Sequence, residues 1–121
     1  MPVFSFRHRI RSFGYAFAGI GYMFRTQHNA WVHLAVTLAV IIAGFSFDIT
    51  GLDWRWIVLA IAIVWLAEAF NTAIEHVCDV VSPEFHASVK RAKDIGAGAV
   101  LITAYAAVII GAMVFAPYLS R

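Results

Sequence analysis

Acidic and polar side chains recur along one otherwise apolar stretch of the chain, EAFNTAIEHVCD. They are three, four or seven residues apart, so a helix would place on one face Glu68, Asn71, Thr72, Glu75 and Asp79. Ionisable side chains at membrane depth are costly and usually face a polar cavity where they have a function. Glu68 is the deepest of these acids and is a candidate to accept a proton. Glu75 and Asp79 lie nearer the headgroups, where a hydrated Mg²⁺ and phosphates could reach them.

The alternative interpretation of this polar face is structural. Asn and Glu side chains also hold membrane helices together through hydrogen bonds, and this would account for Asn71 and Thr72 taken alone. It does not explain why the acids lie on one line toward the same end of the segment. The pattern therefore favours a functional site.

A second polar cluster, in RAKDIGAGAV, precedes the last apolar segment. Lys93 and Asp94 follow Lys90 and Arg91, and cations here could screen the charge of nucleotide phosphates. A basic cluster at the end of a membrane span is also common for reasons of topology alone. The small residues at 96–99 leave room for a neighbouring helix or a ligand.

Other familiar site patterns are absent from the sequence. It contains neither GxxxxGK[S/T] nor GxGxxG, and its five histidines lack the spacing of a zinc site. His33 lies in an apolar segment, and we expect it to be a hydrogen-bonded core residue. The net charge of +2 is small, and the placement of the basic residues suggests a membrane surface before nucleic acid.

Three apolar segments, 30–47, 56–77 and 95–116, must position these side chains. The chain is 62% hydrophobic and 13% charged, with a mean hydropathy of +0.80, which is typical of a membrane protein. Each segment is about long enough to cross a bilayer as a helix. The sequence predicts an all-α membrane protein with a single domain over residues 1–121.

An amphipathic helix is predicted over 4–27, before the first span. Its apolar residues recur at alternating steps of four and three, and a basic line runs beside them. Such a helix tends to lie in the headgroup plane.

The connections between the segments contain helix-breaking residues. Residues 48–55 are expected to form a polar turn broken at Gly51. Ser82 is expected to cap a short polar helix with Pro83 at its first position. Pro117 is expected to end the last span.

The distribution of basic residues predicts the orientation. Seven of the nine Lys and Arg residues precede the first span or lie between the second and third. The positive-inside rule then places the N-terminus and the second loop in the cytoplasm, with the C-terminus outside.

Taken in order, EAFNTAIEHVCD, SPEFH and RAKDIGAGAVL resemble the prokaryotic diacylglycerol kinase and undecaprenol kinase family. The resemblance runs from about Gly14 to the end of the third span. It implies a homotrimer in the bacterial inner membrane, each subunit with a surface helix and three spans. It also implies transfer of the γ-phosphoryl group of MgATP to the hydroxyl of a membrane lipid, at a site shared between subunits.

The resemblance implies roles for individual residues. Glu68 would be the general base, Asn71 would organise the site, and Glu75 would be a metal ligand. The nucleotide would be contacted by Tyr15, Glu84, His86, Lys93 and Asp94.

Two positions depart from the family pattern. Gln27 replaces a frequent second metal-binding glutamate; its amide oxygen can still ligate Mg²⁺ but carries no charge. His8 replaces an arginine of the surface helix, although Arg7 and Arg9 flank it.

The sequence leaves open which lipid is the substrate and which class of function the protein has. SPEFH and the closing FAPYL look more like undecaprenol kinases, and RAKDIG looks somewhat more like diacylglycerol kinases, so undecaprenol is slightly favoured. A non-enzymatic proton or ion pathway could use the same acids. A degenerate member could act only as a membrane assembly partner.

Overall fold

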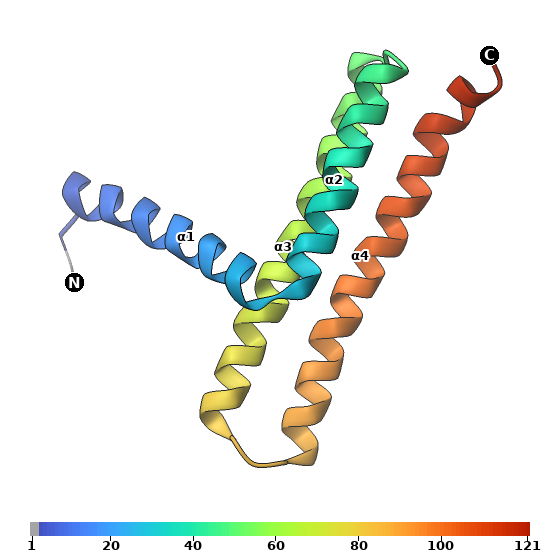
Figure 1. Cartoon of the computed structure of the whole chain (residues 1–121). Helices are drawn as coiled ribbons and strands as arrows, with labels where there is room; N and C mark the ends of the chain where they lie inside the picture. The colour runs from blue at the N-terminus through green and yellow to red at the C-terminus, as the bar shows by residue number, and fades with distance from the viewer. Residues whose placement is uncertain (1–2) are drawn as a thin grey trace.

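The computed structural model describes residues 3–121, and these form four α-helices with no strand among them. In chain order the helices are α1 (Phe6–Thr26), α2 (His28–Ser46), α3 (Gly51–Val81) and α4 (Ala87–Leu119). Figure 1 shows α2 and α4 running along α3, while α1 leaves the bundle at the start of α2. Of the described helices, α2, α3 and α4 are long and apolar enough to cross a membrane. The predicted all-α membrane class, with an additional N-terminal helix, is confirmed.

The helices differ in length, and this difference places the polar residues. α2 has 19 residues and is about 28 Å long, close to the ~30 Å hydrocarbon thickness of a bilayer. α3 has 31 residues and α4 has 33, which correspond to roughly 46 and 50 Å. In Figure 1 the joined ends of α3 and α4 extend past the point where α1 departs. The last turns of α3 therefore belong to a hairpin that projects beyond α2.

α3 is the central helix, because α4 packs along it and both α2 and α1 contact it. At the end of the bundle away from the projecting hairpin, an apolar cluster is formed by buried Ile49, Ile57, Val114 and Tyr118. The Tyr118 hydroxyl donates to Asp53 Oδ2 (2.6 Å) and accepts from the Thr50 N–H (3.1 Å). These bonds join the last turn of α4 to the first turn of α3. Many large apolar side chains elsewhere point outward, as on surfaces that meet a membrane or another protein.

The expectation that Gly51 breaks the chain between the first two spans is wrong. Gly51 is the first residue of α3, and Thr50 caps that helix by accepting the Asp53 N–H at 3.2 Å through Oγ1. The chain reverses instead at Asp48, whose φ is +50°. The cap allows α3 to begin several residues before its apolar part.

The expectation that Pro117 ends the last helix is also wrong, because α4 continues through it to Leu119. Proline removes one intrahelical hydrogen bond and crowds the carbonyl four residues earlier, which weakens the helix at that point. The next residue, Tyr118, is buried and hydrogen-bonded to α3, and this holds the last turn in place.

The predicted short helix beginning at Ser82 does not form. Ser82 instead ends α3, with its N–H bonded to the Cys78 carbonyl, and the next helix begins after His86. A residue before proline is disfavoured in the helical region, and Ser82 is extended (φ −148°, ψ 91°). Its hydroxyl donates to the Glu84 carbonyl at 2.9 Å, which holds the connection in a tight turn.

Candidate active site

The centre of the polar face is a carboxylate enclosed between α2 and α3. The Glu68 side chain is 0% exposed, and its Oε2 lies 3.3 Å from His33 Nε2 on α2. Its Oε1 is buried and has no hydrogen-bond partner within the described residues. His33 is in the second turn of α2, so Glu68 lies near the end of α2 from which α1 departs. His33 is hydrogen-bonded as expected, although its partner was not anticipated.

A second side-chain hydrogen bond joins the same two helices about one turn away. Trp65 Nε1 on α3 donates to Thr37 Oγ1 on α2 at 3.0 Å. Trp65 is three residues before Glu68, and Thr37 is four residues after His33. Together these two bonds fix how far α2 is shifted along α3.

The polar face continues from Glu68 toward the projecting hairpin. Thr72 and Asn71 are both buried, and the Thr72 hydroxyl donates to the Glu68 carbonyl at 2.9 Å. The Asn71 amide nitrogen donates to Glu75 Oε1 at 3.4 Å, so Asn71 restrains a half-buried carboxylate one turn further on. Asn71 Oδ1 is buried without a partner in the described part of the chain. It lies against α4 at Gly96, where an added Cβ would be 2.5 Å from it.

The acids and bases nearest the hairpin turn form two exposed ion pairs. Lys93 Nζ lies 2.5 Å from Asp79 Oδ1 across the two helices, and Lys90 Nζ lies 2.6 Å from Asp94 Oδ2 along α4. Lys93 lies just before the apolar part of α4, and its hydrogen bond with the Asp79 carboxylate raises the pKa of Lys93. This ammonium is therefore charged at physiological pH.

A groove of about 350 Å³ separates α1 from the second half of α3. Tyr15 lines it from α1, together with Tyr22, while Thr72 and His76 line it from α3. His76 Nδ1 lies 2.9 Å from the Thr72 carbonyl, and its Nε2 lies 3.2 Å from the Tyr22 hydroxyl. The sequence does not predict the Tyr22–His76 contact, because no helical spacing relates residues 54 positions apart. It ties the direction of α1 to the polar half of α3.

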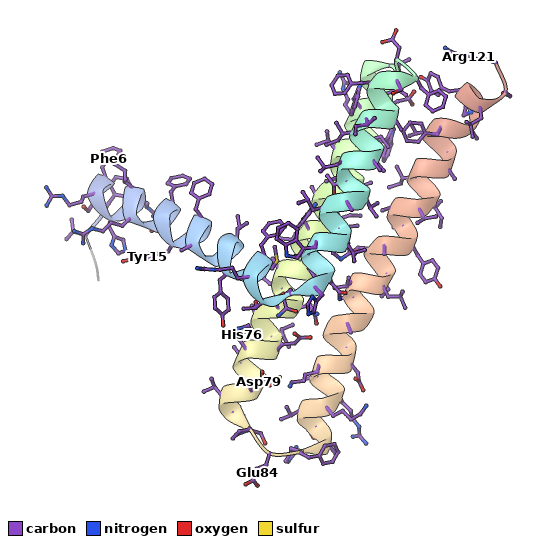
Figure 2. All side chains as sticks on the ribbon, in the orientation of Figure 1. Phe6, Tyr15, His76, Asp79, Glu84 and Arg121 are labelled. Atoms are coloured by element: carbon purple, nitrogen blue, oxygen red, sulfur yellow. The ribbon has the colours of Figure 1, made fainter. Side chains whose placement is uncertain are left out.

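Of the remaining predicted site residues, Tyr15 and Glu84 lie apart from each other within one chain. Figure 2 shows Glu84 at the tip of the hairpin and Tyr15 out on α1. His86 caps α4 by accepting the Ser88 N–H through Nδ1 at 3.2 Å. Gln27 forms the corner between α1 and α2 and makes no side-chain capping bond to α2. A single chain therefore brings together only part of the predicted set.

The oxygen atoms at the centre of this face are suited to a hard cation. In the described residues, no group of three or more His, Cys, Asp or Glu side chains is placed to hold one metal ion. Mg²⁺ does not need such a cage, because it keeps several waters and takes one or two carboxylates from the protein. Glu75 offers a half-buried carboxylate, and Asn71 and Glu68 each offer a buried oxygen without a partner. The donor chemistry fits Mg²⁺ bound through Glu75 and water.

The sequence matches a known family and several named proteins. Residues 14–115 match the family described as prokaryotic diacylglycerol kinase. The chain is 39% identical over 109 residues to the undecaprenol kinase of Bacillus subtilis (strain 168), covering 90% of this chain and 89% of that protein. It is 40% identical over 107 residues to the diacylglycerol kinase of a Synechocystis species, covering 88% and 61% respectively. It is 35% identical over 97 residues to the diacylglycerol kinase of Escherichia coli (strain K12), covering 74% and 79%. The similarity extends over the helices that carry the polar face.

Proposed function

The chain belongs to the prokaryotic diacylglycerol kinase family, and we propose that this lipid kinase transfers the γ-phosphoryl group of MgATP to the hydroxyl of a membrane lipid alcohol. The observation that carries this proposal is the enclosed Glu68 carboxylate with one unpartnered oxygen. We propose that the lipid presents its hydroxyl to this oxygen. Phosphoryl transfer needs positioning, charge neutralisation and a group that takes the hydroxyl proton.

Glu68 is proposed as the general base. The lipid oxygen attacks the γ-phosphorus, its proton moves to Glu68 Oε1, and the bond from phosphorus to the ADP oxygen breaks. Oε1 is the atom suited to this step, because Oε2 is already engaged by His33. A carboxylate placed within hydrogen-bond reach of the proton is the usual requirement for such a base.

Glu75 and Gln27 are proposed to hold Mg²⁺, and Asn71 to position Glu75 through their hydrogen bond. Bound Mg²⁺ would neutralise charge on the phosphates as the γ-phosphoryl group leaves. The nucleotide contacts are proposed to be Tyr15, Glu84, His86, Lys93 and Asp94. The Lys93 ammonium, charged and held at the hairpin, is suited to phosphate oxygens.

We propose that the active site is completed between the subunits of a homotrimer. Tyr15 and Glu84 lie apart within one chain, so a neighbouring subunit must bring such groups to one site (Figure 2). α1 departs from the end of α2 beyond which the hairpin projects (Figure 1), and most of the basic residues lie on α1 and the hairpin. This arrangement supports a bacterial inner-membrane protein with its N-terminus in the cytoplasm.

Undecaprenol is proposed as the favoured lipid over diacylglycerol. The relative from Bacillus subtilis that bears the name undecaprenol kinase is matched over nearly its whole length, which supports this choice. Purified protein in mixed micelles with Mg²⁺ and radiolabelled ATP should phosphorylate undecaprenol with a higher kcat/KM than diacylglycerol. The reverse order would overturn the choice of lipid. No Mg²⁺-dependent phosphorylation of any lipid alcohol would overturn the proposed function.

Enlarging Gly96 should disturb the site through Asn71. Gly96→Ala would place a Cβ 2.5 Å from Asn71 Oδ1, so the amide must rotate away and release Glu75. We expect kcat to fall about tenfold, because small displacements of catalytic groups are costly. The matched control is Gly98→Ala, where an added Cβ meets nothing within 4 Å among residues 3–121. Equal activities of the two variants would contradict the proposed role of Asn71.

A further inference from the structure

His33 makes the one side-chain hydrogen bond to the Glu68 carboxylate in the part of the chain that the structure describes. We propose that His33 is a positioning residue for phosphoryl transfer: it holds Glu68 Oε2, so that Oε1 is presented to the lipid hydroxyl. This inference rests on the proposed role of Glu68 as general base. His33 does not touch the reacting atoms in this proposal, and it keeps its own proton throughout the step.

The Glu68–His33 pair differs from a hydrogen bond that only holds two helices together. A buried carboxylate in a structural pair is normally satisfied at both oxygens, because an unmade hydrogen bond in a dry site is costly. Here the Glu68 side chain is wholly enclosed, yet one oxygen is bonded and the other is not. The His33 side chain is only 16% exposed, so the bond is shielded from water on both sides. Oε1 is therefore the oxygen of this carboxylate that has capacity for a further hydrogen bond.

The position of His33 also restricts where Glu68 can turn. Glu68 is on α3 and His33 is on α2, so their bond crosses between helices and limits rotation of the carboxylate. Without that bond the side chain could adopt other rotamers and direct its oxygens elsewhere. A base must lie within hydrogen-bond reach of the proton it takes, so a mobile carboxylate would be a slower base.

The Thr37–Trp65 bond makes this proposal testable without loss of the fold. It joins the same two helices one turn away, and it does not involve Glu68. A variant lacking the His33 imidazole therefore keeps one of the two polar links between α2 and α3. Thr37→Val is the matched control, because it removes the other link and leaves Glu68 and His33 in place.

The experiment compares His33→Ala, His33→Gln and Thr37→Val in the lipid phosphorylation assay. We expect His33→Ala to lower kcat by about 10- to 100-fold with little change in KM for MgATP. His33→Gln should recover much of the loss, because its amide nitrogen can reach a position near that of Nε2. Thr37→Val should stay within about threefold of the wild-type kcat. All three should remain folded by thermal melting in detergent. A wild-type kcat in His33→Ala, no recovery in His33→Gln, or an equal loss in Thr37→Val would overturn the proposal.

A double-mutant cycle with Glu68→Gln separates this proposal from that of the general base. If His33 acts through Glu68, adding His33→Ala to Glu68→Gln should cause little further loss of residual turnover. A full additional loss would mean that His33 acts independently, and the positioning role would fail. If Glu68→Gln alone retained full activity, the general base proposal would fail, whatever the His33 variants do. If Glu68→Gln were inactive while His33→Ala was unaffected, only the present inference would fail.

Discussion

Replacing Glu68 with Gln is expected to lower kcat for lipid phosphorylation by about 10²- to 10⁴-fold, the usual contribution of a general base. The amide is nearly the same size as the carboxylate, and its oxygen can still accept a hydrogen bond from His33 Nε2. It cannot take the proton of the lipid hydroxyl at neutral pH. The loss should therefore appear in kcat, measured with saturating lipid and MgATP, and not in the amount of folded protein.

A substitution of a second acid tests whether the loss of activity is a general effect of removing a negative charge. Asp48→Asn removes a carboxylate at the exposed turn between α2 and α3, and Asn tolerates the positive φ found there. That variant should retain the wild-type kcat. Glu68→Gln should bind MgATP as the unmodified protein does, measured by calorimetry in detergent. A wild-type rate in Glu68→Gln would remove this residue as the base.

The second large effect is expected from Glu75→Gln, because Glu75 is the proposed carboxylate ligand of Mg²⁺. Loss of groups that merely orient a metal ligand costs about 10- to 100-fold in metal affinity, so loss of the ligand should cost at least about 100-fold. The Mg²⁺ concentration for half-maximal activity should rise, and MgATP binding should weaken with it. A Mg²⁺ titration of the initial rate at fixed ATP measures the shift.

Asp79→Asn is the comparison for that titration. Asp79 is on the same helix one turn further on, but it is exposed and paired with Lys93. Exposed ion pairs contribute little to stability, so this variant should fold normally. Its Mg²⁺ requirement should change much less than that of Glu75→Gln. If Asp79→Asn shifted the titration and Glu75→Gln did not, the metal ligand would be misassigned.

The polar face of α3 could be read from the sequence because it depends only on local geometry. An α-helix has 3.6 residues per turn, so acids spaced three, four and seven apart must share a face once the segment is helical. The length of the apolar runs separated the segments, and the order of residues along the second segment predicted that Glu68 lies deeper than Glu75. The two ends of α3 were less predictable from the composition of the turns. The capping bond of Thr50 decided where α3 begins, and the conformational restriction of Ser82 before a proline decided where it ends.

The sequence by itself therefore determined the class of protein, the presence of three long apolar helices and which residues of α3 face the same way. Only the tertiary structure decided that His33 meets Glu68, 35 residues away, and that Asn71 lies against Gly96. Such pairs depend on how each helix is rotated and shifted along its neighbour. Those two quantities result from the packing of whole helix surfaces, and no spacing within one segment encodes them.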